Sequence, residues 1–254
     1  MTRMSVVIPV LDDAPMLEVC LRTLHEQTRR PDEIIVVDNG SVDNSAAIAH
    51  AAGARVVRED RPGITAAAAR GFDEATGEII ARCDADSQLP PNWLERIEMT
   101  LAANPDAVAI TGPGRFYDLT ATANRFAQVL YVNAYFMSMR AALGNNVLFG
   151  SNCAVRRSQW LQMSASVPRD DTELHDDMDL SFRVHPAARV IHDRDLIVGI
   201  SGRPFRSLSG ARRRMRRAIH TIGLHWPTQS PRRRWKARLK GRPSDSNPSH
   251  PLPR

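Results

Sequence analysis

Segments with two different patterns of apolar and polar positions alternate along roughly the first eighty residues of the chain. Short runs rich in β-branched residues, typical of buried strands, recur between segments whose apolar positions return every three or four residues, typical of helices. We therefore expect strands at 5–10, 34–37, 55–57 and 79–82, and helices at 14–26, 43–52 and 65–76. Strands separated by helices build a parallel sheet with right-handed crossovers, so the expected fold class is α/β.

The middle of the chain is less regular. A helix is expected at 93–101 and a strand at 108–111. A longer apolar stretch, 123–143, has helical spacing, but its polar interruptions exclude a transmembrane span. A helix packed in the core is the simpler interpretation, and a groove for a lipid or an acceptor is the alternative.

The chain has no run of eighteen uncharged apolar residues, and its first residues, MTRMSVVIPV, enter a strand without the layout of a signal peptide. These features predict a cytoplasmic protein that does not span a membrane. The cysteines Cys20, Cys83 and Cys153 are odd in number and far apart, which argues against a disulfide framework and a zinc site. We expect them to be small buried residues.

Charge is distributed unevenly. The net charge is +6, but residues 206–254 contain fourteen basic residues and one acid, so this segment carries +13 and the remainder carries −7. Attraction to polyanions is therefore expected to be local to the C-terminal segment.

The start of that segment, 206–226, can be drawn as a helix with apolar residues at three- and four-residue steps: Leu208, Ala211, Met215, Ile219 and Ile222. Basic residues face elsewhere, and Trp226 could anchor the helix at an interface. This pattern predicts binding to an anionic membrane surface, with 232–240 and Trp235 repeating it. Docking of a solvated helix on the acidic body is the alternative, and nucleic acid ranks third because aromatic-rich readout elements are lacking. Residues 241–254 are expected to be disordered.

Acidic and amide side chains follow three of the expected strands, namely Asp12, Asp13, Asp38, Asn39, Asp84 and Asp86. In open sheets of this kind, ligands bind in the crevice outside the carboxyl ends of the strands. A crevice this acidic would repel a diphosphate unless a divalent cation lay between them.

Asp84-Ala85-Asp86 is the most suggestive of these segments. An extended backbone would send both carboxylates to the same side, and hard oxygen ligands suit Mg²⁺ or Mn²⁺. A D-x-D triplet alone is weak evidence, because aspartate also serves turns for structural reasons.

Four segments in order resemble glycosyltransferase family 2, over about residues 4–205. They are the N-terminal stretch SVVIPVLDDAPMLEVCLRTLHEQTRRPDEIIVVDNGSVDNS, then ITAAAARGFDEATGEIIARCDAD, FGSNCAVRR and HDDMDLSFRV. The resemblance implies a GT-A fold, that is, a Rossmann-like mixed and mostly parallel sheet flanked by helices. It also implies inverting, metal-dependent transfer from a nucleoside diphosphate sugar.

The resemblance assigns roles on the donor side. Pro9, Asp12, Asp38 and Asn39 match positions that hold the nucleoside, and Arg70 matches an arginine that grips the diphosphate. Asp84 and Asp86 match the metal-binding motif, with Asp86 as the direct ligand. Gly150, Ser151 and Asn152 match the segment bordering the donor sugar and the acceptor.

On the acceptor side, Asp177 of HDDMD matches the general base of the family. A positioned carboxylate that removes the acceptor proton lowers the barrier for a weak hydroxyl nucleophile. The crowding of Asp176, Asp177 and Asp179 could also raise an apparent pKa, and the same acids could cap a helix.

Two later residues complete the expected site. His192 matches a histidine that some GT-A enzymes use as a metal ligand, with His175, His185 and Asp193 as nearby competitors, and Arg203 of SGRPF is expected to reach a phosphate. Three positions depart from the family pattern: Leu11 replaces an aromatic residue, Val42 replaces Thr, and Gly71 stands where Asn often follows the arginine. These departures leave the nucleotide base undetermined.

The sequence thus predicts a GT-A catalytic domain over 1–205, a basic amphipathic helical tail over 206–240 and a disordered terminus over 241–254. The expected reaction moves a hexose-type sugar from a UDP-, GDP- or dTDP-sugar to an acceptor hydroxyl, with Mg²⁺ or Mn²⁺. A lipid-linked or envelope glycan acceptor would fit a peripheral location on the inner face of the plasma membrane. The alternatives are a sugar-phosphate nucleotidyltransferase, against which the absence of an early glycine-rich loop argues, and a non-catalytic module that binds membranes or polyanions.

Overall fold

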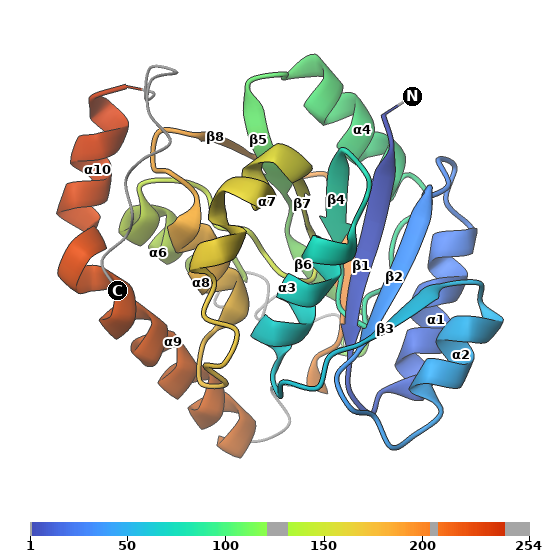
Figure 1. The fold of residues 1–254 in the computed structure, drawn as a ribbon. Helices are drawn as coiled ribbons and strands as arrows, with labels where there is room; N and C mark the ends of the chain where they lie inside the picture. Colours follow the sequence, from blue (N-terminus) through green and yellow to red (C-terminus); the bar gives the residue numbers. More distant parts are fainter. Residues whose placement is uncertain (1, 121–131, 204–207, 242–254) are drawn as a thin grey trace.

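The structure is a computed structural model that describes residues 2–120, 132–203 and 208–241. A seven-stranded sheet in the order β3-β2-β1-β4-β7-β5-β8 forms its centre (Figure 1). The strands are β1 (Met4–Val10), β2 (Glu33–Asp38), β3 (Arg55–Arg58), β4 (Ile79–Arg82), β5 (Ala107–Thr111), β7 (Cys153–Arg156) and β8 (Arg189–His192). Only β7 runs antiparallel to its neighbours, β4 and β5, so the sheet is mixed and mostly parallel, as expected.

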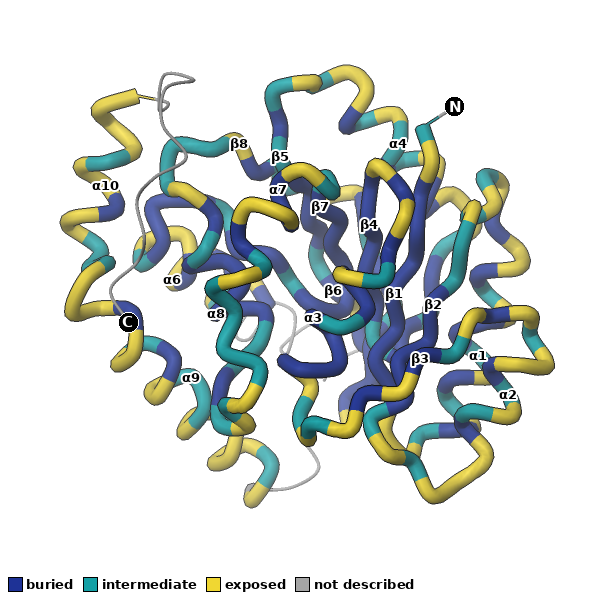
Figure 2. The backbone as a smooth tube through the Cα atoms, viewed as in Figure 1, coloured by how far each residue is buried: buried dark blue, intermediate teal, exposed yellow. Residues whose placement is uncertain are grey.

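Helices cover both faces of the sheet. On one face α1 (Ala14–His25), α4 (Trp93–Ala103) and α6 (Ala134–Leu143) share a core with alternate residues of β1. On the other face α3 (Ile64–Glu74), α7 (Arg157–Met163) and α8 (Asp176–Arg183) pack against the intervening positions. Because successive strand side chains point to opposite faces, a strand buried on both sides reads as one continuous apolar run. Figure 2 shows the sheet as the most buried part of the molecule.

Gly71 explains one departure from the family pattern. A Cβ built at this position would lie 2.3 Å from Cγ1 of Val7 on β1 and 2.9 Å from Cγ2 of Val37 on β2. Helix α3 therefore crosses the sheet so closely that a side chain here would force it away. Glycine is therefore required here so that α3 can pack closely on the sheet.

A two-stranded parallel sheet, β6 (Gly114–Phe116) with β9 (Val198–Ile200), follows the end of β5. The bridge between Gln88 and Gly199 ties it to the loop after β4. This small sheet was not predicted from the sequence, because three-residue strands carry too little periodicity to stand out.

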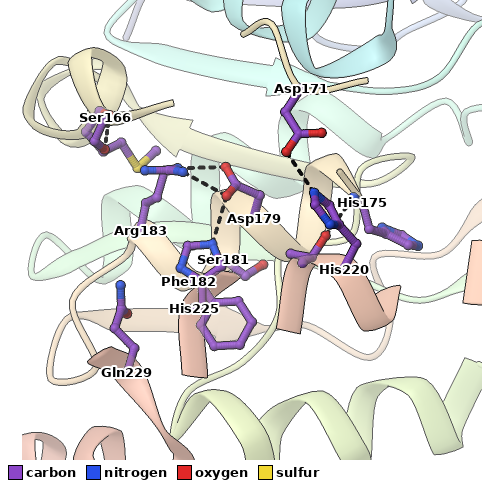
Figure 3. Close-up of polar contacts among 12 residues, drawn as sticks. Ser166, Asp171, His175, Asp179, Ser181, Phe182, Arg183, His220, His225 and Gln229 are labelled. Atoms are coloured by element: carbon purple, nitrogen blue, oxygen red, sulfur yellow. Dashed lines mark hydrogen bonds and ion pairs between the residues drawn. The ribbon is translucent and has the colours of Figure 1, made fainter. Parts of the chain in front are cut away.

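The basic segment forms α9 (Leu208–Gln229) and α10 (Pro231–Leu239), which pack along α8 and α6 (Figure 1). Thr221 and His225 of α9 and Arg234 of α10 are buried. His225 Nε2 lies 2.8 Å from Asp179, whose carboxylate also pairs with Arg183, and its ring stacks on Phe182 (Figure 3). The inner face of this segment therefore packs on the folded body, as in the alternative of a helix docked on it.

The expected elements of the first 111 residues are all present, with boundaries within about two residues. The expected helix 123–143 is described from 132 onward, and its earlier part lies outside the described residues. The remaining helix of the N-terminal half, α2 (Ser45–Ala51), lies beside α1. Among the residues described, no helix combines the length and hydropathy that a membrane crossing requires. All three cysteines are buried and unpaired.

Candidate active site

Asp84 follows β4 at the carboxyl edge of the sheet. Its Oδ2 accepts a hydrogen bond from Ser151 Oγ at 2.5 Å, and its Oδ1 lies 3.3 Å from Nη2 of Arg82. Burial raises the pKa of Asp84 to about 6, although Arg82 opposes the shift. Asp84 is half-buried, and a further cation nearby would favour its charged form.

Asp86 lies two residues further on, in a turn. The hydroxyl of Ser87 accepts a hydrogen bond from the Asp84 N–H at 3.1 Å, which closes the turn. The sequence argument assumed an extended backbone here, and this assumption was wrong because the strand ends at Arg82 and Ala85 and Asp86 form a turn. Asp86 pairs instead with Arg203, whose Nη2 lies 2.9 Å from Asp86 Oδ2.

Arg203 holds a second carboxylate as well. Its two terminal nitrogens donate to the two oxygens of Asp13 at 2.8 and 2.6 Å, a forked pair. Burial raises the pKa of Asp86, and the hydrogen bond and charge of Arg203 counteract part of that rise. The predicted phosphate-binding arginine thus neutralises two acids of the crevice in this structure.

Arg82, which the sequence argument missed, joins the two halves of the site. This side chain is buried, and its Nη2 lies 2.5 Å from Asp176 Oδ2 as well as 3.3 Å from Asp84 Oδ1. The charges of Asp176 and Asp84 raise its pKa against the opposing effect of burial. The available signal was an arginine closing an otherwise apolar strand immediately before the D-x-D triplet.

Asp177 occupies the first turn of α8, beside Asp176. Its Oδ2 accepts a hydrogen bond from the N–H of Gly150 at 3.2 Å, while its Oδ1 accepts one from Tyr135 Oη at 3.3 Å and lies 2.6 Å from Nδ1 of His175. Burial acts to raise the pKa of Asp177, but the facing His175 and the hydrogen bonds lower it below its usual value. Asp177 is therefore ionised at neutral pH, and the expected rise from crowding does not occur.

The acids of the crevice fit a divalent cation. Asp84, Asp86 and Asp13 offer hard oxygen donors, and because burial raises the pKa of both Asp84 and Asp86, a cation would favour their charged forms. Another group, His175, Asp176 and Asp177, is the one set of three potential ligands within 4.8 Å of one another among the described residues. Arg82, which is buried, and His175 balance that second group, whereas the arginine paired with Asp86 and Asp13, Arg203, is exposed and can move aside, so the D-x-D side is the better candidate.

The expected nucleoside residues shape the loops after β1 and β2. Asp12 accepts a hydrogen bond from the N–H of Val42 at 2.7 Å, and Asp38 accepts one from the N–H of Ser41 at 2.9 Å. The side chain of Asn39 holds the loop after β3 through three hydrogen bonds. It donates to the carbonyls of Glu59 and Arg61 and accepts from the N–H of Gly63. Their contact with a nucleoside stays a prediction.

Pro9 fits its strand for a backbone reason. The β1–β4 ladder ends at Val7 opposite Arg82, so Pro9 lies beyond it and its missing N–H interrupts no bond to β4. Arg70, on α3, forms an ion pair with Glu74 at 2.9 Å and is partly exposed. Its contact with a diphosphate also stays a prediction.

Asn152 is fully buried, at 0% exposure, and its amide is saturated. It accepts from Trp93 Nε1 at 2.8 Å and donates to the carbonyls of Pro113 and Leu196. This side chain braces the sheet, so donor contacts in this segment would fall to Gly150 and Ser151.

The structure does not bring His192 together with Asp84 and Asp86. No group of three potential ligands containing His192 occurs among the described residues. Its ring packs on Phe136 with centroids 4.4 Å apart, and burial followed by the charges of Arg194 and Arg140 lowers its pKa. Of the other candidates, His175 pairs with Asp177 and Asp193 pairs with Arg96. The geometry gives no support to His192 as a ligand of the D-x-D cation.

Comparison with known proteins gives a consistent picture. A family model described as glycosyl transferase family 2 matches residues 5–162, which confirms the resemblance found in the sequence. The putative glycosyltransferase EpsH of Bacillus subtilis (strain 168) is 28% identical over 201 residues, covering 74% of this chain and 57% of EpsH. An undecaprenyl-phosphate 4-deoxy-4-formamido-L-arabinose transferase of Sodalis glossinidius (strain morsitans) is 34% identical over 123 residues, covering 44% of this chain and 38% of that protein. The chain thus matches little more than half of EpsH and less of the transferase.

Among solved structures, the mannosyltransferase PcManGT from Pyrobaculum calidifontis, in complex with GDP-Man and Mn²⁺, has a similar fold. The TM-score is 0.69 at 23% identity, covering 94% of this chain and 68% of that one. The mixed sheet with helices on both faces is therefore a GT-A fold.

Proposed function

The chain belongs to glycosyltransferase family 2, and from that premise we propose that it transfers a sugar from a nucleoside diphosphate to an acceptor hydroxyl with inversion. The acceptor oxygen forms a bond to the anomeric carbon as the bond from that carbon to the β-phosphate oxygen breaks. The acceptor proton goes to the enzyme and the nucleoside diphosphate leaves. No covalent enzyme intermediate is needed.

Asp86 and Asp84 would hold Mg²⁺ or Mn²⁺ on the donor side, with Asp13 beside them. The cation supplies neutralising charge for the diphosphate leaving group. Arg203, now paired with Asp86 and Asp13, is close enough to exchange a carboxylate for a phosphate oxygen when the donor enters. The Mn²⁺ in the PcManGT complex supports this choice of cofactor.

Asp177 would act as the general base. Its carboxylate is ionised and held in place by Gly150, Tyr135 and His175, so it is ready to accept a proton without first losing one. The pairing with His175 lowers its basicity and fixes its direction. Proton transfer would leave the carboxyl group of Asp177 neutral as the hydroxyl attacks.

One observation carries the proposal: buried Arg82 bridges Asp84, on the donor side, and Asp176, next to the base. The carboxylates proposed to bind the metal and the carboxylate proposed to accept the proton would therefore lie close together, at the carboxyl edge of the sheet. A chain that kept the fold for packing alone would have no need of a buried cation between two acids there.

Calorimetry with UDP, GDP and dTDP, each with and without Mn²⁺, tests the donor side. We expect one nucleotide to bind tightly only with Mn²⁺, and Asp86→Ala to remove that dependence on the metal. Metal-independent binding, or none, would overturn the assignment.

Asp177→Asn tests the base. The amide keeps the shape but accepts no proton, so transfer should fall by about 10²–10⁴-fold while Mn²⁺-dependent nucleotide binding stays unchanged. The acceptor-independent hydrolysis of a UDP- or GDP-sugar gives a usable assay while the acceptor is unidentified. Near-full activity in this variant would exclude Asp177 as the base.

The exposed side of α9 supports a peripheral membrane location. Met215 and Ile219, each 63% exposed, and Trp226, 42% exposed, lie on the side away from α8, with Arg212 and Arg216 next to them. Such a face would place a lipid-linked acceptor near the crevice, and the undecaprenyl-phosphate relative agrees with that acceptor class.

Liposome sedimentation tests this location with full-length protein. The double variant Met215→Gln/Ile219→Gln should lose binding to vesicles rich in anionic lipid, because it removes the apolar contact and keeps the charge. Met99→Gln, which changes a methionine 65% exposed on α4, is the matched control. Unchanged sedimentation of the double variant would sink the membrane proposal.

A further inference from the structure

A cavity of about 660 Å³ opens at the end of β8 and β5, against α6. Pockets for small molecules in proteins commonly have about 300–1,000 Å³. Residues that line this one include Arg115, Arg140, Arg194, His192, Phe136 and Asn146. The candidate-site residues Asp84, Asp86 and Asp177 are not among its lining residues, so the cavity lies beside the candidate active site.

Three arginines from different elements meet at this cavity. Arg115 lies on β6, Arg140 on α6 and Arg194 just after β8. Within 2–120, 132–203 and 208–241, none of the three guanidinium groups has a hydrogen bond or ion pair, and no carboxylate lines the cavity with them. Most other arginines at this edge of the sheet do have acidic partners, as Arg82 and Arg203 show.

The nearest carboxylates are already occupied. Arg96 of α4 binds Asp193 through two contacts at 2.5 and 2.8 Å and reaches Asp195 at 3.0 Å. These acids flank Arg194 in the sequence, yet they are turned to another cation. The three arginines at the cavity therefore have no carboxylate partner among the described residues, and their positive charge is not neutralised there.

The positive charge at the cavity also acts on His192. Besides burial, the charges of Arg194 and Arg140 lower the pKa of its imidazole, which places both guanidinium groups within electrostatic reach of the ring. Like charges held together around a hollow are unfavourable unless an anion joins them. Guanidinium groups suit phosphate in particular, because their planar forks match its oxygens.

Helix α6 connects this cavity to the candidate base. Tyr135 donates a hydrogen bond to Asp177 at 3.3 Å, and the next residue, Phe136, lines the cavity. Phe149 packs against both rings, with centroids 6.3 Å from Tyr135 and 5.9 Å from Phe136. A molecule anchored in the cavity would therefore reach the proton-accepting carboxylate across two aromatic residues.

We propose that this cavity is the acceptor subsite and that Arg115, Arg140 and Arg194 bind a phosphate group carried by the acceptor. The acceptor role rests on the proposed glycosyl transfer, whereas phosphate binding itself does not. Phosphate at the arginines and a hydroxyl at Asp177 would give the acceptor one orientation. The source of the phosphate is either a soluble phosphomonoester or the headgroup of a lipid phosphate.

The test is calorimetry on the full chain with glycerol 3-phosphate, with glycerol, and with farnesyl phosphate in neutral detergent micelles. The variant is Arg140→Gln/Arg194→Gln, which removes two exposed charges and should fold normally. The matched control is Arg30→Gln, an exposed arginine in the loop before β2 that does not line the cavity. Mn²⁺-dependent nucleotide binding is measured in all three proteins.

We expect one or both phosphate probes to bind the wild-type protein while glycerol does not. Each lost arginine should weaken binding by about tenfold, so the double variant should bind about 100-fold more weakly. Arg30→Gln should match the wild type, and nucleotide binding should be the same throughout. Binding of glycerol 3-phosphate identifies a soluble source, and binding of farnesyl phosphate alone identifies a lipid.

The proposal is overturned if neither phosphate probe binds, or if the double variant binds them as tightly as the wild type. Competition between the phosphate probe and nucleotide would also overturn it, because the probe would then occupy the donor site. If the wild-type protein does not bind nucleotide, glycosyl transfer is refuted instead. Arginine-dependent phosphate binding would survive that result as a separate property.

Discussion

At the scale of single residues, Arg203 and a divalent cation compete for the same oxygens. Arg203 lies 2.6 Å from Asp13 and 2.9 Å from Asp86, and both contacts help to raise its own pKa. A carboxylate oxygen that accepts a guanidinium hydrogen bond is a poorer metal ligand. In the proposed mechanism, the ion and the arginine would therefore exchange partners when the donor enters.

This competition gives a prediction for Arg203→Gln. Without nucleotide, the variant should bind Mn²⁺ about tenfold more tightly than the wild type, because Asp86 and Asp13 lose their charged partner. Electron paramagnetic resonance of free Mn²⁺ during titration measures the change, with Arg30→Gln as the control. Weaker binding in Arg203→Gln would show that the arginine positions these acids for the ion.

The same scale shows what the sequence could reveal about the site. Asp84, Asp86 and Asp177 could be predicted because their motifs keep a fixed local spacing. Arg82 was missed because its partners Asp84 and Asp176 are 2 and 94 positions away, and the second is close only in the folded protein. The role of His192 stays a prediction, since a motif match does not say which way a side chain at a strand end will turn.

At the scale of elements, a buried charge cluster joins α8 to α9 (Figure 3). Asp179 accepts from Arg183 at 2.6 and 2.8 Å and lies 2.8 Å from His225 of α9, and all three side chains are nearly inaccessible. Burial would raise the pKa of Asp179, but the hydrogen bonds of His225 and Arg183 bring it below its usual value. The cluster requires Asp179 to be ionised.

The stability of the protein should therefore depend on pH through Asp179. Its pKa is lower in the folded than in the unfolded chain, so its contribution is complete above the unfolded value, about 4, and disappears as the pH falls through the folded value. Asp179→Asn should destabilise the protein by about 3–5 kcal/mol at pH 7 and by less near pH 3. Urea unfolding at both pH values measures the difference.

Asp60→Asn is the control for that experiment, because Asp60 pairs with Arg58 on the surface and both side chains are largely exposed. A surface pair contributes little, so this variant should follow the wild type at both pH values. An equal loss of stability at pH 7 and pH 3 in Asp179→Asn would show that packing, not charge, dominates the cluster.

Elements were more predictable from the sequence than their order in space. Period and β-branched content identify β1 to β5, since these strands are apolar runs between helices. The insertion of antiparallel β7 between β4 and β5 was not foreseen, because pairing partners far apart in the chain leave no local signal. The packing of α9 was likewise left open, since its buried polar residues Thr221 and His225 look like surface residues in a helical projection.

At the scale of the whole molecule, the basic segment supports the catalytic edge as well as balancing charge. The N–H of His175 donates to Thr221 Oγ1 at 2.8 Å, Arg216 lies 2.6 Å from Glu173, and His220 lies 2.8 Å from Asp171. The loop that leads into Asp177 is thus held along the length of α9. Part of the uneven charge along the sequence is compensated by these contacts, and the outer face of α9 keeps the rest.

Arg234 is the strongest link between this segment and the body. It is buried and donates to the carbonyls of Leu143, Phe182 and Val184 at 2.6, 2.7 and 2.9 Å. These carbonyls lie at the C-terminal ends of α6 and α8, where the helix dipoles favour a cation. Burial lowers the pKa of Arg234 to about 10, so it stays charged at neutral pH.

Arg234→Met should release α10 from both helices. The substitution leaves three carbonyls without their donor, and we expect a loss of about 3 kcal/mol, which for a protein of this size lowers Tm by roughly 6–12 °C. Limited proteolysis should cut first between α9 and α10, and transfer should fall with Mn²⁺-dependent nucleotide binding retained, because the helix that carries Asp177 loses its support. Arg232→Met, an exposed neighbour, is the control. If Arg234→Met matched Arg232→Met in Tm and proteolysis, the basic segment would be an attachment to the body, and its contacts with α8 could not be what positions the base.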